Sequence, residues 1–244
     1  MQLPKHFFAE RNWQKNMLMG KLLIEFRSIR CRLTSPKYYG LNDMDMVLER
    51  HLPSNGFFVE LGANDGRKQS NTLHLEKYHG WGGVLIEPEI KNFEKCEKNR
   101  KAKVVNAACV SFTYDKKTVS LIYSDLMTIA SSGLETDILK PAEHATLGMS
   151  VQKDVSTYEF SAPALTLNSI LKQHSPKNRV DLLSLDVEGA EIEVLKGVDH
   201  NQYRFDHCLI ESRSEKKLVE YMRKNDYELI KKLSEHDLLF RSTR

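Results

Sequence analysis

Short apolar runs alternate with amphipathic stretches along the chain from Gly56 onward. This alternation is typical of a parallel β-sheet covered by helices, because strands buried on both faces read as continuous apolar runs. The predicted strands are Phe57–Leu61, Gly83–Ile86, Lys103–Ala107, Val180–Leu185 and His207–Ile210. The predicted helices between them are Ser70–Tyr78, Ile90–Asn99, Leu167–His174, Ala190–Leu195 and Glu215–Lys224. The pattern therefore predicts a Rossmann-like α/β fold with helices on both faces of the sheet.

Three segments depart from this rhythm. Asn42–Leu52 gathers its apolar residues near one helical face, and Asp43 is placed to cap the start of that helix. Residues 111–164 have mixed polarity and predict an insertion of the kind that forms a lid or substrate loop. The tail predicts two strands, Tyr227–Leu233 and Leu238–Arg241, joined by a short turn. With this antiparallel hairpin the expected sheet is mostly parallel and seven-stranded.

Length and charge divide the chain into two parts. Its 244 residues suit one domain with a sizeable core, and 41% hydrophobic with 28% charged residues is ordinary for a globular protein. Residues 1–40 carry a net charge of +6 and the remainder −3. We therefore expect a basic N-terminal helical extension over 1–40 and a domain over 41–244. The extension suits a solvated helix packed on one side, with peripheral contact to an anionic membrane as an alternative; no nucleic-acid partner is expected.

Two further features bear on location and metal content. We find neither an apolar run long enough to span a membrane nor an export signal at the start of this sequence, so we expect a soluble, cytoplasmic protein. The four cysteines, Cys31, Cys96, Cys109 and Cys208, are scattered and lack CxxC spacing. This spacing argues against a cysteine zinc site or a disulfide framework, and no metal ligands are assigned.

The most informative stretch is FFVELGANDG, residues 57–66, in which an apolar strand runs into a glycine-containing turn. Ligands of open α/β sheets bind at such strand ends, where glycine permits sharp turns and close approach of the backbone. A GxGxxG dinucleotide fingerprint starting at Gly62 would need glycine at Asn64 and Arg67. Glu60 places a carboxylate at the mouth, which would repel a pyrophosphate but suits the sulfonium and ammonium groups of S-adenosylmethionine. We predict that the turn holds this compound, through Glu60, Gly62, Ala63, Asn64, Asp65 and Gly66.

The next two predicted strands extend this site. Glu87 ends GVLIEP about two dozen residues after the glycine turn, the spacing of a ribose-binding acid, and Pro88 stiffens the exit. A carboxylate can accept hydrogen bonds from both ribose hydroxyls. Asn106, beside Ala107, ends the third strand and could present its amide to the adenine edge.

An acidic cluster follows the fourth predicted strand in LLSLDVEGAEIEVLKG, residues 182–197. Asp186 and Glu188 lie at the strand end and are expected to face the same crevice, joined by Glu211 from the fifth strand. We predict that they act as a catalytic base or orient the site, with Asp186 also beside the cofactor; magnesium ligation is the alternative. Glu191 and Glu193 fall in the first helical turns, where they are expected to cap the helix or to be solvated.

The runs FFVELGANDGRKQSNTLHLEKYHGWGGVLIEP, DLLSLDVEGAEIEVLKGVD and SEHDLLF resemble the FkbM-type methyltransferases, from about Tyr38 to Phe240. The resemblance implies a class I methyltransferase fold, S-adenosylmethionine as methyl donor, and O-methylation of a hydroxyl on a sugar, glycan or natural product. It also implies that Ser70 and Asn71 open the first helix and help the loop to grip the donor. The acceptor stays open, because one fold serves many substrates.

Other interpretations and residues remain. A nucleotide-sugar-binding enzyme and a non-catalytic module that keeps the fold are the two rival functions. Conceivable alternative bases are His74, His79, His144, His174 and His236, although such residues more often serve packing or the surface. Trp81, between two glycines, is expected to pack in the core.

Overall fold

The computed structural model describes residues 37–124, 127–132 and 157–244, and Tyr38–Arg244 forms one compact unit. The predicted N-terminal helical extension lies outside the described residues, except for its last four positions. His144 and Cys31 also lie outside them.

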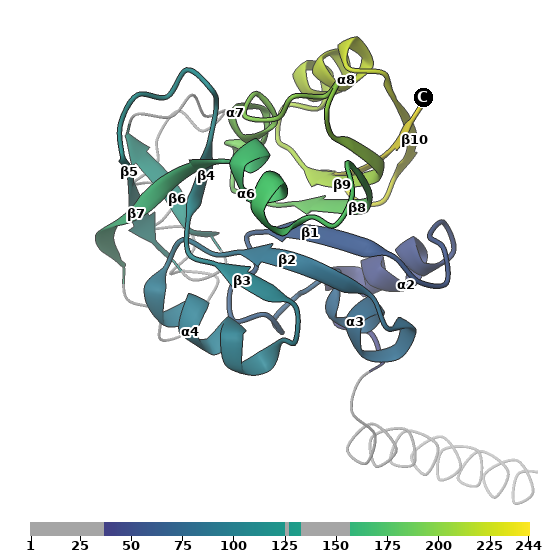
Figure 1. The fold of residues 1–244 in the computed structure, drawn as a ribbon, viewed down its shortest axis with the longest axis horizontal. Helices are drawn as coiled ribbons and strands as arrows, with labels where there is room; N and C mark the ends of the chain where they lie inside the picture. Colours follow the sequence, from purple (N-terminus) through teal and green to yellow (C-terminus); the bar gives the residue numbers. More distant parts are fainter. Residues whose placement is uncertain (1–36, 125–126, 133–156) are drawn as a thin grey trace, which may run out of the picture. The chain divides into compact units, whose positions relative to one another are not determined.

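A seven-stranded sheet forms the centre of this unit (Figure 1). Its strands are β1 (Phe57–Leu61), β2 (Gly82–Ile86), β3 (Lys103–Val105), β8 (Arg179–Leu185), β9 (Arg204–Glu211), β10 (Tyr227–Lys232) and β11 (Asp237–Ser242). The strand order is β10-β11-β9-β8-β1-β2-β3. Neighbours from β3 to β9 pair in parallel, whereas β11 is antiparallel to both β9 and β10. The predicted parallel sheet closed by a C-terminal antiparallel hairpin is therefore confirmed.

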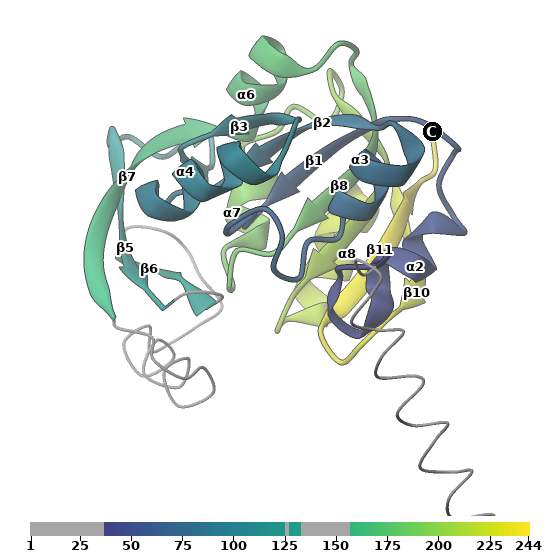
Figure 2. The same ribbon diagram turned by 90° about the horizontal axis from the view of Figure 1, so that it is seen from below.

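Helices cover both faces of the sheet, as Figures 1 and 2 show. They are α2 (Met44–Glu49), α3 (Leu73–His79), α4 (Ile90–Asn99), α6 (Leu167–His174), α7 (Glu191–Leu195) and α8 (Glu215–Lys224). One core cluster joins α6, α7 and α8 to Val59 and Leu61 of β1, and another joins α2, α3 and α4 to Phe58. This division follows from the strand geometry, because successive side chains point to opposite faces. In the described part of the chain, no helix is both long and apolar enough to cross a bilayer.

The helix predicted over Asn42–Leu52 is shorter than expected. A 3-10 turn, η1 (Leu41–Asp43), precedes α2, and α2 ends at Glu49. Asp43 does occupy the N-cap position, but its backbone is left-handed with φ of 56° and its side chain makes no capping hydrogen bond. The buried Asp45 instead anchors this segment, since its carboxylate accepts a hydrogen bond of 2.7 Å from the backbone N–H of Tyr39.

The predicted insertion over 111–164 contains part of a second sheet, which lies to the left of the main sheet in Figures 1 and 2. It consists of β4 (Ala108–Val110), β5 (Thr118–Tyr123), β6 (Ile129–Ser132) and β7 (Tyr158–Thr166), in the order β4-β7-β5-β6. The strand predicted to run to Ala107 ends at Val105, and the chain then enters this sheet at β4. Strands β5 and β7 are partly exposed, so their sequences lack the continuous apolar runs by which buried strands are predicted.

Candidate active site

A cleft opens at the carboxyl ends of β1, β2 and β8. Among the residues predicted to bind the cofactor or act in catalysis, those that line it are Gly62, Asn64, Glu87, Pro88, Ala107, Asp186 and Glu188. Apolar side chains from the strand ends and from α7 complete the inner wall, among them Leu61, Ile86, Val187 and Val194. Strand-end positions from three parallel strands thus converge on one cleft, as the sequence predicts.

Gly62 brings the ends of two strands into close contact. Its φ is +78°, and a Cβ at this position would lie 1.9 Å from the carbonyl oxygen of Asp186. The backbone N–H groups of Gly62 and Ala63 each lie 3.2 Å from the carbonyl oxygen of Ile86 and donate hydrogen bonds to it. The turn after β1 is therefore fixed to the ends of β2 and β8, which define the cleft.

Glu87 holds a buried carboxylate at the edge of the cleft, with 5% of its surface exposed. Its Oε2 accepts a hydrogen bond of 2.8 Å from the backbone N–H of Asn64, and its Oε1 accepts one of 2.9 Å from that of Glu89. These bonds fix the carboxylate between the turn after β1 and the start of α4. A carboxylate has lone pairs for about four hydrogen bonds, so this fixed group can also accept from a ligand diol.

Asn106 lies close to Glu87 but serves a different purpose from the one predicted. Its side-chain amide donates two hydrogen bonds of 2.9 Å, to the backbone carbonyls of Glu87 and Pro88. Asn106 does not line the cleft, whereas its neighbour Ala107 does. Its amide therefore holds the exit of β2 in place rather than presenting itself to a ligand.

Glu60 does not face the cleft, which corrects the prediction that it meets the positive charge of the cofactor. Its carboxylate lies under α3 and α4, where it accepts hydrogen bonds from Ser70, Thr72, the backbone of Asn71 and Arg100. The Arg100 guanidinium is fully buried and lies 3.2 Å from Glu60 Oε2. The reason is strand alternation, since Glu60 shares the face of Phe58. Glu60 supports the loop between β1 and α3 from behind.

The rest of the loop between β1 and α3 is also stabilised by contacts with other parts of the protein. Asp65 caps its own turn, because its Oδ1 accepts from the backbone N–H groups of Arg67 and Lys68. A Cβ at Gly66 would lie 2.7 Å from Arg100 Cγ, so this glycine makes room for a buried arginine rather than for a ligand. The helix predicted to begin at Ser70 begins at Leu73 in the structure, where it is α3. The backbone N–H of Leu73 donates a hydrogen bond to the Ser70 hydroxyl.

Asp186 connects the first cleft with a second, smaller cavity. The second cavity is lined by Asn71, Ser184, Glu211 and Asp237, and Asp186 and Gln69 belong to both linings. Asn71 donates a hydrogen bond of 3.2 Å from its amide to Ser184. Glu188 lines only the first cleft, not the second cavity, and it forms an ion pair of 3.3 Å with Arg213. The predicted acidic residues therefore meet around Asp186 but divide between two cavities.

The carboxyl groups of Asp186 and Glu211 lie at the adjoining ends of β8 and β9, where both line the second cavity and each affects the pKa of the other. Asp186 is exposed to solvent where the two cavities meet, while the protein atoms around its carboxyl group partly desolvate it. This desolvation, together with the charges of Glu211, Glu188 and Glu191, raises the pKa of Asp186 well above the usual range. Desolvation first, then the charges of Glu188 and Asp237, raise the pKa of Glu211. A pair of this kind retains a proton to higher pH than an isolated carboxylate and titrates as a unit.

Glu191 and Glu193 are buried, so neither is the solvated residue that the sequence allowed. Glu191 holds the turn before α7 rather than capping the helix, because its Oε1 accepts from the backbone N–H groups of Val187 and Gly189, which precede the helix start. Burial raises the pKa of Glu191 to about 7. Glu193 accepts a hydrogen bond from Ser111, which ties α7 to the segment after β4.

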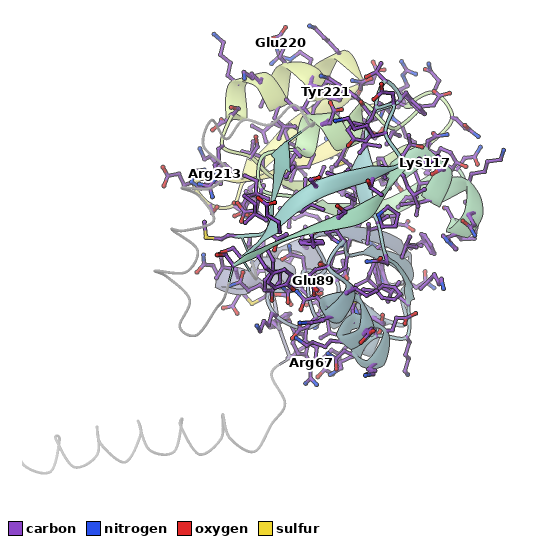
Figure 3. All side chains as sticks on the ribbon, turned by 90° about the vertical axis from the view of Figure 1, so that its left-hand side faces the viewer. Arg67, Glu89, Lys117, Arg213, Glu220 and Tyr221 are labelled. Carbon is purple, nitrogen blue, oxygen red and sulfur yellow. The ribbon has the colours of Figure 1, made fainter. Side chains whose placement is uncertain are left out.

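The second sheet forms the outer wall of the cleft, a contribution that the sequence pattern does not reveal. Leu121 and Ala130 of this sheet, together with Thr128 just before β6, line the cleft opposite the strand ends of the main sheet. Tyr158 of β7 donates a hydrogen bond of 2.9 Å to Glu89, which joins the wall to the start of α4. Figure 3 views the molecule from this side, with Glu89 labelled. The partly exposed strands gave too little apolar signal to predict this wall.

The remaining candidate side chains lie away from the cleft. His74 and His79 form a cluster with Glu49 on the other side of α3, and His174 ends α6. His236 lies in the turn between β10 and β11. Trp81 is buried with the core residues of α2, α3 and α4, as predicted. Cys96, Cys109 and Cys208 are buried free thiols, of which Cys109 lines the cleft.

The lining of the cleft combines acidic and apolar side chains that suit the chemical groups of S-adenosylmethionine. Its described lining includes three carboxylates, Glu87, Asp186 and Glu188, against one basic side chain, Lys68. This charge suits a sulfonium and an ammonium group and disfavours a pyrophosphate. The apolar residues Ile86 and Ala107, next to Glu87, suit an adenine joined to a ribose diol. The residues present therefore fit this cofactor.

A parallel sheet closed by an antiparallel hairpin, with an acidic cleft at its strand ends, defines a class I methyltransferase fold. The chain belongs to the FkbM methyltransferase family, since the family model described as "Methyltransferase FkbM domain" matches residues 60–236. S-adenosylmethionine is the cofactor of this class of methyltransferase. The resemblance found in the sequence motifs is thereby confirmed.

One curated relative is "Methyltransferase sdnD" of Sordaria araneosa, which is 27% identical over 176 residues. The match covers 63% of this chain and 64% of the relative, so the chain spans less than two thirds of that protein's length.

Solved structures of other methyltransferases are more distant. A TehB-like S-adenosylmethionine-dependent methyltransferase from Corynebacterium glutamicum has 10% identity and a TM-score of 0.45, with 92% of this chain and 97% of that chain covered. M. capricolum TrmK in complex with S-adenosyl-homocysteine has 12% identity and a TM-score of 0.41, with 82% and 68% covered. The family assignment rests on the matched family model and the strand order.

Proposed function

We propose that this chain transfers a methyl group from S-adenosylmethionine to a hydroxyl group of a sugar, glycan or natural product. The observation that carries the proposal is the position of Asp186, which lines both the main cleft and the smaller acidic cavity. A group at this junction can contact a donor on one side and an acceptor hydroxyl on the other.

The main cleft supplies the donor site in this proposal. Glu87 accepts hydrogen bonds from the ribose hydroxyls, held in position by Asn64 and Glu89. Gly62 keeps the turn after β1 against the ends of β2 and β8, which shapes the cleft, and Ala107 and Ile86 would pack against the adenine. S-adenosylmethionine supplies a sulfonium-bound methyl group, which an oxygen nucleophile takes with release of S-adenosylhomocysteine.

Asp186 is the proposed catalytic base. An alcohol is a weak acid, so a base placed at its proton assists the attack, and a carboxylate with a raised pKa is a stronger base than an ordinary one. The hydroxyl proton passes to the Asp186–Glu211 pair as the new oxygen–carbon bond forms. Glu211 then acts as the partner that shares this proton, while Glu188, paired with Arg213, holds the loop after β8.

The proposal is tested by incubating the full chain with isotope-labelled S-adenosylmethionine and pools of cell-derived glycans, lipid-linked sugars and small-molecule alcohols. Mass spectrometry of the products should show the gain of one labelled methyl group on oxygen. Asp186→Asn should reduce turnover by about 100-fold or more while it still binds the donor. Asp115→Asn, at an exposed site, is the matched control and should retain turnover.

Three outcomes contradict this proposal. Full turnover by Asp186→Asn would exclude Asp186 as the base. Donor binding without transfer to any acceptor pool would favour the rival non-catalytic module. Affinity for a nucleotide-sugar with none for S-adenosylmethionine would favour the other rival function.

A further inference from the structure

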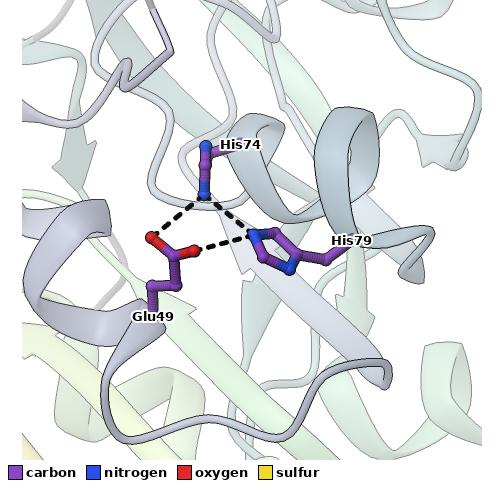
Figure 4. Close-up of side chains that lie close together, drawn as sticks. All are labelled: Glu49, His74 and His79. Atoms are coloured by element: carbon purple, nitrogen blue, oxygen red, sulfur yellow. Dashed lines mark hydrogen bonds and ion pairs between the residues drawn. The ribbon is translucent and has the colours of Figure 1, made fainter.

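Glu49, His74 and His79 bring three potential metal ligands together outside the cleft (Figure 4). Glu49 is the last residue of α2, and the two histidines lie in the first and last turns of α3. In the described part of the chain, this is the one group of three or more such residues whose ligand atoms converge within 4.8 Å. We propose that Glu49, His74 and His79 form a binding site for a divalent transition metal, with Zn²⁺ as the preferred ion.

The separations between neighbouring ligand atoms are close to those of a tetrahedral zinc site, with a different oxygen of Glu49 next to each histidine. His79 Nε2 lies 3.0 Å from Glu49 Oε1 and 3.1 Å from His74 Nε2, and His74 Nε2 lies 3.4 Å from Glu49 Oε2. Zinc bonds of about 2.0–2.1 Å to nitrogen and oxygen place two ligands of a tetrahedral site roughly 3.3 Å apart. All three measured separations lie close to this value.

The two histidines also face each other in the manner of ligands. Both present Nε2 to the same point, and a metal would let both rings be neutral with their lone pairs directed inward. Without a metal, one ring must donate a proton to the other, and Glu49 would then hold a hydrogen-bonded histidine pair. This metal-free network is the alternative that the experiment must exclude.

The surroundings hold the ligands in place. The Tyr38 hydroxyl donates a hydrogen bond of 2.7 Å to Glu49 Oε2, and the Tyr38 ring lies 4.5 Å from the His74 ring. Such outer contacts orient ligands in established metal sites. The His74 side chain is fully buried, whereas those of His79 and Glu49 are 26% and 27% exposed. Water therefore has access from the solvent side as a fourth ligand.

The ligand set indicates both the kind of metal and its effect. Two imidazoles with one carboxylate favour zinc and similar transition metals over magnesium or calcium, which prefer oxygen ligands. Glu49 precedes the region matched by the family model, whereas both histidines lie within it. A bound ion would link α2 to α3, so it is expected to stabilise the fold rather than to take part in methyl transfer.

Calorimetric titration of ZnCl₂ into the chelator-treated full chain tests the proposal. We expect one strong site in the wild type, and an affinity reduced by more than about 100-fold in His79→Gln and in Glu49→Gln. His51→Gln removes an exposed histidine outside the cluster and is the matched control. Both test variants change partly exposed side chains, so they should fold as the wild type does, and circular dichroism checks this. His74→Gln is not used, because His74 is fully buried and its substitution could disturb the fold.

Two further readouts separate this site from the metal-free network. Co²⁺ in place of Zn²⁺ should give the intense visible absorption of a tetrahedral site in the wild type and in His51→Gln but not in His79→Gln. Zinc should raise the midpoint of thermal unfolding of the wild type and of His51→Gln, but not that of His79→Gln, because a ligand that binds the native state stabilises it. The proposal is overturned if the wild type binds neither ion, or if His79→Gln and Glu49→Gln bind zinc with unchanged affinity.

Discussion

The carbonyl oxygen of Asp186 occupies the space beside Gly62 that a side chain would fill, at 1.9 Å from an ideal Cβ. We therefore expect Gly62→Ala to separate the ends of β1 and β8. The substitution adds a backbone penalty of about 1–2 kcal/mol for a positive φ to the cost of the clash. The free energy of unfolding should fall by more than about 2 kcal/mol in urea titrations, and donor affinity should fall with it.

Gly82→Ala is the matched control for Gly62→Ala. The nearest heavy atom to a Cβ at Gly82 lies 3.7 Å away, in the Phe57 ring, which is ordinary contact. This variant should have wild-type stability or gain up to about 1 kcal/mol, because alanine restricts the unfolded chain. Equal stability losses in the two variants would show that the contact with Asp186 is not what requires glycine at position 62.

Glu60 should matter for stability before it matters for ligand binding. Glu60→Gln removes the charge opposite the buried Arg100 and should lower the free energy of unfolding by on the order of 3 kcal/mol. Glu97→Gln, on the exposed side of α4, should change it little. If Glu60→Gln keeps wild-type stability but loses donor binding, Glu60 contacts the ligand and its supporting role is wrong.

The buried Glu191 predicts a pH dependence of stability. Burial raises its pKa to about 7 from an ordinary value near 4.5, so between these pH values the native state binds more protons than the unfolded state. Stability should therefore fall as the pH rises from about 4.5 to about 7. Asp186 and Glu211 contribute in the same direction, because their pKa values are also raised.

Glu191→Gln should remove part of this slope, since the amide stays neutral while its carbonyl can still accept from Val187 and Gly189. Urea unfolding at pH 5 and pH 8 measures the effect: the difference between the two pH values should shrink relative to wild type. Glu220→Gln, which is fully exposed on α8, should leave the difference nearly unchanged. An unchanged difference in Glu191→Gln would mean that Glu191 is ionised in the native state at both pH values.

The sequence predicts the main sheet well because its central strands are buried on both faces and read as continuous apolar runs. The sequence also predicts that Gly62, Glu87 and Asp186 lie at one cleft, because the carboxyl ends of parallel strands share one edge of the sheet. It fails for Glu60 and Asn106, because position along a strand does not reveal which face or backbone group satisfies a polar side chain. Glu60 bonds with Arg100, 40 residues away, a contact that no local pattern encodes.

The same limit applies to the second sheet and to the histidine cluster. Strands β5 and β7 are partly exposed, and the wall that they form depends on packing against the main sheet. Glu49 and His79 are 30 positions apart in the printed sequence and meet only because α2 and α3 cover the same face of the sheet. Predicting either feature requires the fold to be known first.

The central claim is that the cleft binds S-adenosylmethionine through Glu87, and calorimetric titration of the cofactor into wild type and Glu87→Gln tests it most directly. We predict one site in the wild type and an affinity about 10- to 100-fold lower in Glu87→Gln, from the loss of charge-assisted hydrogen bonds worth about 1.5–3 kcal/mol. Glu94→Gln, exposed on α4, should bind as wild type does. The claim is contradicted if the wild type does not bind the cofactor, or if correctly folded Glu87→Gln binds it with unchanged affinity.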